Sequence, residues 1–169
     1  MRIETERLVL DALTATDAPA LAAIAGNPAV APMLLIFPSP CPVEFAAGVI
    51  ARSQDCSRPG FRLAVREGGA LAGSVGISPT DGAGASSVMY FLDPARWGRG
   101  LMGEAMRAFV DACLARFDLA ALTASRYEDN PASGAILTRL GFKEIGRGMG
   151  ASAARQAPAP EILYRLEAA

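Results

Sequence analysis

The segment that most constrains this fold is a glycine-rich turn, which lies between an apolar strand-like run and the longest helical pattern in the chain. It reads Asp93-Pro94-Ala95-Arg96-Trp97-Gly98-Arg99-Gly100-Leu101-Met102-Gly103. Glycines let the backbone turn sharply and let a ligand approach the main-chain amides. A helix that begins at such a turn adds unpaired N–H groups and the positive end of its dipole. The segment therefore predicts a binding site for a pyrophosphate group.

The rest of the chain predicts a mixed α/β sheet around this turn. Apolar positions 102, 105, 106, 109, 110, 113, 114 and 117 recur with the period of an amphipathic helix. Further helices are expected after Thr14 and up to Gly26, over residues 43–52, and from Pro131 to Gly141. About six or seven strands are expected, over residues 8–10, 61–66, 71–77, 88–92, 121–125, 142–145 and 162–166. Residues 147–160 are rich in Gly, Ala and Pro and are expected to form a mobile loop.

Length and composition exclude several classes of protein. A chain of 169 residues is expected to form a single domain, and its net charge of −1 favours neither nucleic acid nor a membrane surface as partner. No histidine is present, so a Ser-His-Asp triad, a Cys-His dyad and a His metal site are excluded. The three cysteines form no Cys-x-x-Cys pattern, and no metal site is predicted. Without a signal peptide or an apolar run of about 20 residues, the protein is expected to be cytoplasmic.

The glycines of the turn also match a dinucleotide-binding pattern, Gly98-x-Gly100-x-x-Gly103. Three features count against that interpretation. Five residues separate Leu92 from Gly98, whereas a dinucleotide-binding turn leaves its strand almost at once. No acid occurs at the tip of the next strand before Glu128, and about half of the chain precedes the motif. A nicotinamide-dependent oxidoreductase is therefore the weaker alternative.

Four segments together resemble the GNAT N-acetyltransferases, and most closely the branch that includes the ribosomal-protein alanine acetyltransferases. Residues 97–105 resemble the acetyl-CoA loop of the family, and residues 4–10 resemble the opening strand of that branch. Tyr90-Phe91-Leu92-Asp93-Pro94 resembles its central strand. Asn130-Pro131-Ala132-Ser133, followed by Leu140-Gly141-Phe142, resembles its third signature. The resemblance covers nearly the whole chain, with the segments in the order of the family.

The resemblance implies a mostly antiparallel sheet whose central strand pair splays apart to admit the pantetheine arm of acetyl-CoA. Backbone groups near Phe91 and Leu92 would pair with this arm, and Asn130 would reach the arm or the amine from the other side. The pyrophosphate would lie on the turn amides, and the implied residues of this loop are Trp97, Gly98, Arg99, Gly100, Leu101, Met102 and Gly103. A continuous, fully paired sheet near Leu92 would remove this binding slot.

The implied reaction is direct attack of a primary amine on the thioester of acetyl-CoA. The acceptor would be a small molecule or a peptide, no metal is needed, and a homodimer is one assembly that the sequence leaves open. Two roles are predicted for Asn130: it caps the N-terminus of the helix, and in the catalytic site it contacts the pantetheine arm or the amine. Ser133 could protonate the leaving thiolate, or be only a hydroxyl in the first turn of the helix. Tyr90 is interpreted as a core residue.

Three positions depart from the family pattern and keep a second hypothesis open. Met102 stands where the family favours Gly or Ala, and its expected role is core packing. Ser87 stands where many relatives carry an acidic residue, and Leu137 where many carry a tyrosine that protonates the thiolate. The nearest acids to the site, Glu128 and Asp129, are expected in a solvated turn. These losses leave a non-catalytic acyl-CoA-binding regulatory module as the alternative function.

Overall fold

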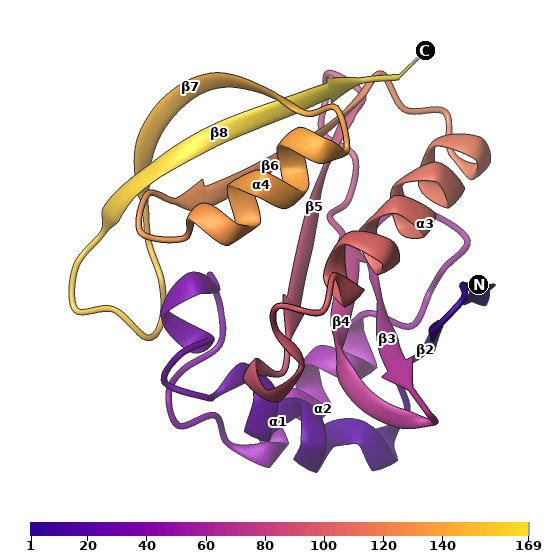
Figure 1. Ribbon diagram of the computed structural model, residues 1–169, viewed down its shortest axis with the longest axis vertical. Coiled ribbons are helices and arrows are strands. Elements are labelled where there is room, and N and C mark those ends of the chain that lie inside the picture. The colour runs from indigo at the N-terminus through magenta and orange to yellow at the C-terminus, as the bar shows by residue number, and fades with distance from the viewer. Residues whose placement is uncertain (169) are drawn as a thin grey trace.

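The computed structural model describes residues 1–168, which form one mixed sheet of eight strands with helices on both faces (Figure 1). The order across the sheet is β1-β2-β3-β4-β5-β6-β8-β7. The strands are β1 (Ile3–Glu4), β2 (Leu8–Ala12), β3 (Phe61–Glu67), β4 (Ala70–Ile77), β5 (Ala85–Leu92), β6 (Ala121–Tyr127), β7 (Lys143–Gly150) and β8 (Ala159–Glu167). The α-helices are α1 (Ala18–Ala25), α2 (Val43–Arg52), α3 (Leu101–Arg116) and α4 (Pro131–Arg139).

The sheet divides between β5 and β6, as the resemblance implied. This pair is parallel and joins only residues 85–87 to residues 121–123, whereas all other neighbouring strands are antiparallel. From Val88 to Leu92, β5 is paired with β4 alone. Figure 1 shows β5 continuing beside β4 while β6, β8 and β7 curve away from it. The splayed pair is confirmed, and the separation begins four residues before Leu92.

Alternation along β3 explains how two helical layers pack on one sheet. Phe61 faces α3, where its ring lies 6.0 Å from that of Phe109. Ala64 faces the opposite side and belongs to the core that α1 and α2 build. That second core includes Phe37 and Phe91, whose rings meet edge to face at 5.6 Å. The two faces of the sheet therefore carry separate cores.

Two strand predictions differ from the structure. β7 continues to Gly150 and β8 begins at Ala159, so only residues 151–158 remain of the loop expected over 147–160. Glycine has low intrinsic β propensity, and Gly146, Gly148 and Gly150 concealed the strand. Cross-strand pairing with β8 overrides this preference. A two-residue strand, β1, was also not expected.

The ion pair between Asp17 and Arg66 makes the stability of the fold depend on pH. The Arg66 guanidinium bonds both oxygens of Asp17 at 2.8 Å, and it lowers the pKa of that carboxyl to about 2. Asp17 also accepts a bond from the Thr14 N–H at 2.7 Å. A carboxyl with a lowered pKa stabilises the fold above its unfolded pKa of about 4 and loses this effect as the pH falls toward 2.

We expect Asp17→Asn to lower the free energy of unfolding by about 1–2 kcal/mol at pH 7, because the charge on a mostly buried partner of Arg66 is lost. The difference from the wild type should shrink as the pH falls from 4 to 2. Urea unfolding at several pH values measures it. Asp111→Asn, at an exposed position of α3, is the matched control and should change little. A difference that stays constant down to pH 2 would contradict the assigned ion pair.

Candidate active site

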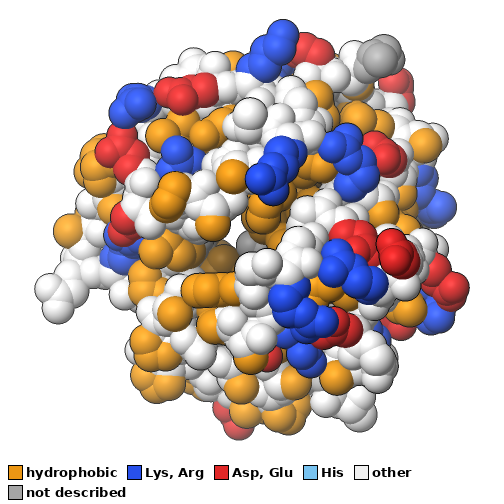
Figure 2. Space-filling model, viewed as in Figure 1, with side chains coloured by type: hydrophobic (Ala, Val, Ile, Leu, Met, Phe, Trp, Pro, Cys, Tyr) orange, Lys and Arg blue, Asp and Glu red, His pale blue; other side chains and the backbone are white. Residues whose placement is uncertain are grey.

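A cleft of about 1210 Å³ occupies the gap between the splayed strands. Figure 2 shows it as a hollow near the middle of the face, with hydrophobic side chains around it. Its walls come from the segment between α1 and α2, the separated part of β5, the glycine-rich turn, the start of α4, and the facing ends of β6, β7 and β8. The cleft thus joins most of the segments that the sequence singled out.

The glycine-rich turn forms one end of the cleft and requires its glycines. Gly98 and Gly100 have φ angles of 74° and 76°, in the left-handed region that side chains rarely adopt. Gly100 is the N-cap of α3, and the first bond of the helix runs from the Glu104 N–H to the Gly100 carbonyl. The N–H groups of residues 101–103 have no acceptor within residues 1–168. Three free amides at a helix N-terminus are suited to bind an anion.

Hydrogen bonds and ion pairs of neighbouring side chains hold the glycine-rich turn in place. Glu67 accepts bonds from Arg99 at 2.6 Å and from Arg96 at 3.5 Å, and Glu104 accepts one from Arg7 at 2.7 Å. The Trp97 indole N–H donates to the Leu92 carbonyl at 2.9 Å, which ties the turn to the end of β5. The Arg99 side chain therefore fixes the turn. The free donors of the turn are its main-chain amides and the Arg96 Nε–H, which is buried without a partner within residues 1–168. Met102 is 6% exposed, in the core role expected of it.

The separated part of β5 presents main-chain groups to the cleft. The Asp93 N–H donates to the Ala72 carbonyl of the neighbouring strand at 2.8 Å. In an antiparallel pair the groups of alternate residues point to the same side. Phe91 therefore directs its main-chain groups to β4, as Asp93 does, while Tyr90 and Leu92 direct theirs to the gap. One gap-facing group, the Leu92 carbonyl, already accepts the Trp97 bond.

A hydroxyl pair crosses the cleft between β5 and α4. The Tyr90 hydroxyl lies 2.7 Å from Ser133 Oγ and 3.2 Å from the Ser133 carbonyl. Burial raises the pKa of Tyr90 to about 12, so the phenol stays protonated at neutral pH. Asn130 Oδ1 accepts a bond from the Ser133 N–H at 3.2 Å, which is the predicted N-cap. The core interpretation of Tyr90 missed this hydroxyl contact, because sequence alone does not show where α4 docks.

Of the three acidic residues near the start of α4, two form ion pairs and one does not. Glu128 pairs with Arg147 at 2.7 Å, and Asp129 pairs with Arg155 at 2.9 Å. Glu161, which the sequence analysis did not single out, lies in the wall of the cleft and is partly buried. Its carboxylate has no hydrogen-bond or ion-pair partner within residues 1–168. Glu161 directly precedes the strand that the sequence predicts over residues 162–166, and no local pattern singles it out.

The opening of the cleft opposite the turn is bordered by two segments that bind each other. The Arg155 Nε donates to the Pro32 carbonyl at 2.7 Å, and its guanidinium lies 4.4 Å from the centre of the Tyr127 ring. The Ala153 N–H donates to the Leu35 carbonyl at 2.9 Å. Leu35 itself is 66% exposed, so this border presents apolar surface to solvent. The loop between β7 and β8 and the segment between α1 and α2 therefore frame one entrance.

The family model of the acetyltransferase (GNAT) domain matches residues 7–143, most of the chain. The protein belongs to this family. The predicted family and the predicted activity, acetyl-CoA-dependent acetyl transfer to an amine, are thereby confirmed, and the oxidoreductase alternative is not supported. A search among curated proteins found no match.

Solved structures confirm the GNAT fold. The chain is similar to a GNAT-family acetyltransferase from Bacillus anthracis, with 17% identity, a TM-score of 0.83, and 99% and 98% of the two chains covered. It is similar to RimL, a ribosomal L7/L12 α-N-protein acetyltransferase in complex with coenzyme A, with 17% identity, a TM-score of 0.80 and the same coverage. It is also similar to a ribosomal-protein-S5-alanine acetyltransferase from Vibrio fischeri, with 19% identity, a TM-score of 0.79, and 99% and 97% covered.

Within residues 1–168, no group of three or more His, Cys, Asp or Glu side chains is placed to hold a metal ion. None of the described helices is long and apolar enough to cross a membrane. The GNAT reaction needs neither a metal nor a second cofactor, because acetyl-CoA brings an activated thioester.

Proposed function

We propose that acetyl-CoA lies in the gap between β5 and β6, with its pantetheine arm along the unpaired edge of β5. The observation that carries this proposal is that free main-chain groups of β5 and the free amides of the α3 turn face the same cleft. An amide-containing arm can bond to an open strand edge as another strand would. The alternation of β5 favours Tyr90 and the Leu92 N–H as its partners, and places Phe91 in the wall rather than at a hydrogen bond.

The pyrophosphate is then expected on the turn from Trp97 to Gly103. The amides of Leu101, Met102 and Gly103 supply donors, and the dipole of the 16-residue helix α3 favours the negative charge. Arg99 acts by holding the turn through Glu67, and Trp97 by holding it against Leu92. This assignment keeps every predicted loop residue in the site but divides the residues between binding and support.

Acetyl transfer requires the amine to lose a proton and the thiolate to gain one. The nitrogen of the neutral amine attacks the thioester carbonyl, the C–S bond breaks, and the products are an amide and the free thiol of coenzyme A. A free N–H on β5 can stabilise the oxyanion. The Tyr90–Ser133 pair can donate a proton to the thiolate. Glu161, the unpaired carboxylate of the cleft, can accept the proton of the amine through water.

The acceptor that we propose is a peptide N-terminus or another primary amine that enters between residues 29–37 and the loop after β7. Two neighbours in fold are named as acetyltransferases of ribosomal proteins, which supports a peptide acceptor. We also propose that residues 1–169 act as one cytoplasmic domain, with a homodimer as one assembly. A thiol-release assay over a library of amines tests the proposed function. We expect thiol release that depends on the amine supplied. If no amine in the library causes thiol release, the non-catalytic alternative is favoured.

We expect Tyr90→Phe to lower kcat about 10-fold or more, because the donor to the thiolate is lost. In the wild type, kcat/KM should rise with pH toward the amine pKa of about 10. The phenol, with its pKa of about 12, should not limit the rate below that point. Single-turnover kinetics across this range measure both effects. Tyr164→Phe, which removes a phenol hydroxyl that bonds Arg126, is the control. Equal kcat values for Tyr90→Phe and the wild type would remove Tyr90 from the mechanism.

A further inference from the structure

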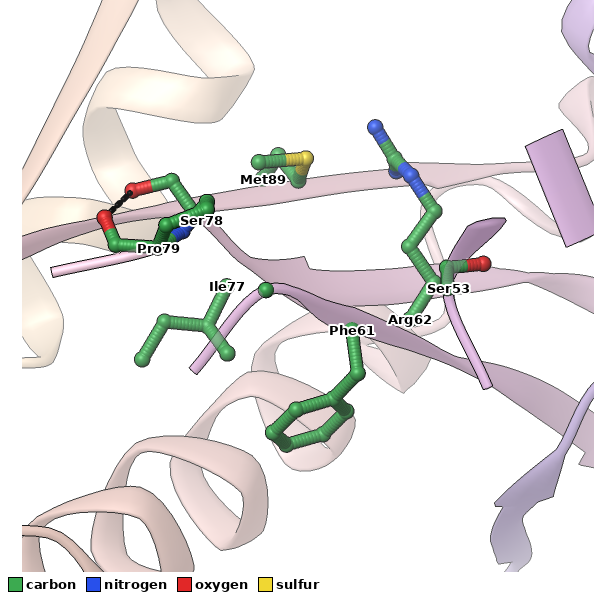
Figure 3. Close-up of a pocket in the computed structure, with 8 residues that line it drawn as sticks. Ser53, Phe61, Arg62, Ile77, Ser78, Pro79 and Met89 are labelled. Atoms are coloured by element: carbon green, nitrogen blue, oxygen red, sulfur yellow. Dashed lines mark hydrogen bonds between the residues drawn. The ribbon is translucent and has the colours of Figure 1, made fainter. Parts of the chain in front are cut away.

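Arg62 is an arginine that the acetyl transfer does not use. It lies on β3, next to Phe61, whose ring faces α3. Neighbouring residues of a strand point to opposite faces, so Arg62 points to the face of α1 and α2. Figure 3 shows this directly: Arg62 and Met89 rise on one side of the strands, while Phe61 and Ile77 lie on the other. Arg62 and Met89 also line the large cleft.

The guanidinium of Arg62 lacks an acceptor. Within residues 1–168 its side chain makes no hydrogen bond and no ion pair, and its Cζ lies 5.8 Å from the centre of the Phe37 ring. Desolvation lowers the pKa of Arg62 to about 10, so the group is still charged at neutral pH. A partly buried cation without an acceptor destabilises a fold. Its position is therefore better explained by a ligand than by stability.

Three other arginines line the cleft, and each differs from Arg62 in its contacts or its exposure. Arg126 donates to the carbonyls of Tyr127 and Glu128 at 3.0 and 3.2 Å. Arg96 pairs with Glu67 at 3.5 Å, although its Nε has no partner within residues 1–168. Arg139 is exposed at the end of α4. Arg62 is thus the half-buried arginine of the cleft whose whole guanidinium lacks a partner within residues 1–168. It lies on the opposite face of the sheet from α3, whose N-terminal turn is the expected site of the coenzyme phosphates.

We propose that Arg62 binds an oxyanion of the acceptor, a carboxylate or a phosphate, so that the natural acceptor carries an amine and an anionic group on one molecule. This inference rests on the proposed function and adds the substrate class. A guanidinium presents paired N–H donors that match the two oxygens of a carboxylate or phosphate. Glu161, which lines the same cleft without a partner within residues 1–168, would favour the ammonium end of such a zwitterion. The cleft is lined mostly by hydrophobic side chains, which suits an apolar linker between the two charged ends.

The first test compares matched acceptors. Linear ω-amino carboxylates and ω-aminoalkyl phosphates of several lengths are compared with neutral ω-amino amides of the same lengths. We expect the best anionic amine to exceed its neutral counterpart by about 100-fold in kcat/KM. Arg62→Met should remove this preference, Arg62→Lys should keep part of it, and Arg58→Met, at an exposed site, should keep all of it. The carboxylate and phosphate series show which anion the site prefers. Equal turnover of anionic and neutral amines by the wild type would overturn the inference.

A binding measurement tests Arg62 without turnover. With saturating coenzyme A and constant ionic strength, inorganic phosphate should raise the Tm of the wild type and of Arg58→Met but not of Arg62→Met. Arg62→Met alone should keep or raise the Tm, because an unpaired cation is removed, whereas a structural role beside Phe37 predicts a lower Tm. If phosphate raises the Tm only when Arg62 is present, but the protein acetylates no amine, the proposed function is refuted and the anion site stands. Amine acetylation without phosphate protection or anion preference would refute the site alone.

Discussion

Gly100→Val should weaken acetyl-CoA binding by at least 10-fold. Gly100 has a φ of 76°, and a β-branched residue held there costs about 1–3 kcal/mol in backbone strain. The mutant can relieve this strain by moving the turn, which displaces the free amides of residues 101–103 from the pyrophosphate. Space alone does not forbid the side chain, because the nearest atom to a Cβ at this position is an Arg7 nitrogen at 3.7 Å. Titration calorimetry with acetyl-CoA measures the change.

The matched control for this change is Gly141→Val. Gly141 also has a positive φ, 92°, and its nearest contact to an added Cβ is Leu166 at 3.6 Å, but it follows α4 and does not line the cleft. It should lose a similar amount of stability and keep its affinity for acetyl-CoA. If Gly100→Val binds acetyl-CoA as the wild type does, the turn has a structural role only.

Asn130→Ala and Asn130→Asp should separate the two roles that the sequence gives this residue. Oδ1 of Asn130 accepts the capping bond from Ser133, and Nδ2 donates to no group within residues 1–168. Aspartate caps a helix as well as asparagine does, but it lacks the amide donor, so Asn130→Asp should keep its stability. Asn130→Ala should lose about 1 kcal/mol of stability. If Nδ2 binds pantetheine or the amine, both variants should lose about 10-fold or more in kcat/KM.

Thermal unfolding and thiol release, measured on the same preparations, decide between these roles. Thr138→Ala, at an exposed position of α4, controls for substitution in this helix. Full activity in Asn130→Asp, with loss of stability in Asn130→Ala, would reduce Asn130 to a cap. The catalytic assignment of Asn130 would then be wrong, while the acetyl-CoA site could stand.

Features encoded locally were predictable from the sequence. The glycine-rich turn, the periodic helix α3 and the cap at Asn130 each depend on residues within a short window, and the structure has all three. The division between β5 and β6 followed from the family resemblance, since no local pattern marks where two distant strands part. Glycines that read as loop became part of β7, because its pairing with β8 comes from residues that lie further along the chain.

The chemistry inside the cleft depends on distant residues that meet only in the folded chain. Tyr90 and Ser133 are 43 positions apart and form a hydroxyl pair. In the sequence, Arg62 reads as an ordinary strand residue and Glu161 directly precedes an expected strand. Only the packing shows that their charged groups are left without partners. The sequence could therefore identify the cofactor and its loop, while the acceptor side required the arrangement of α1, α2 and the last two strands.

Amide hydrogen exchange, with and without acetyl-CoA, tests the central claim most directly. If the pantetheine arm pairs with the open edge of β5 and the pyrophosphate lies on the turn, acetyl-CoA should slow exchange at the amides of Tyr90, Leu92 and residues 98–103. The Phe91 amide, which faces β4, should be protected already and change little. NAD should slow none of them. Slowed exchange confined to other parts of the chain, or the same protection by NAD, would contradict the acetyl-CoA site described here.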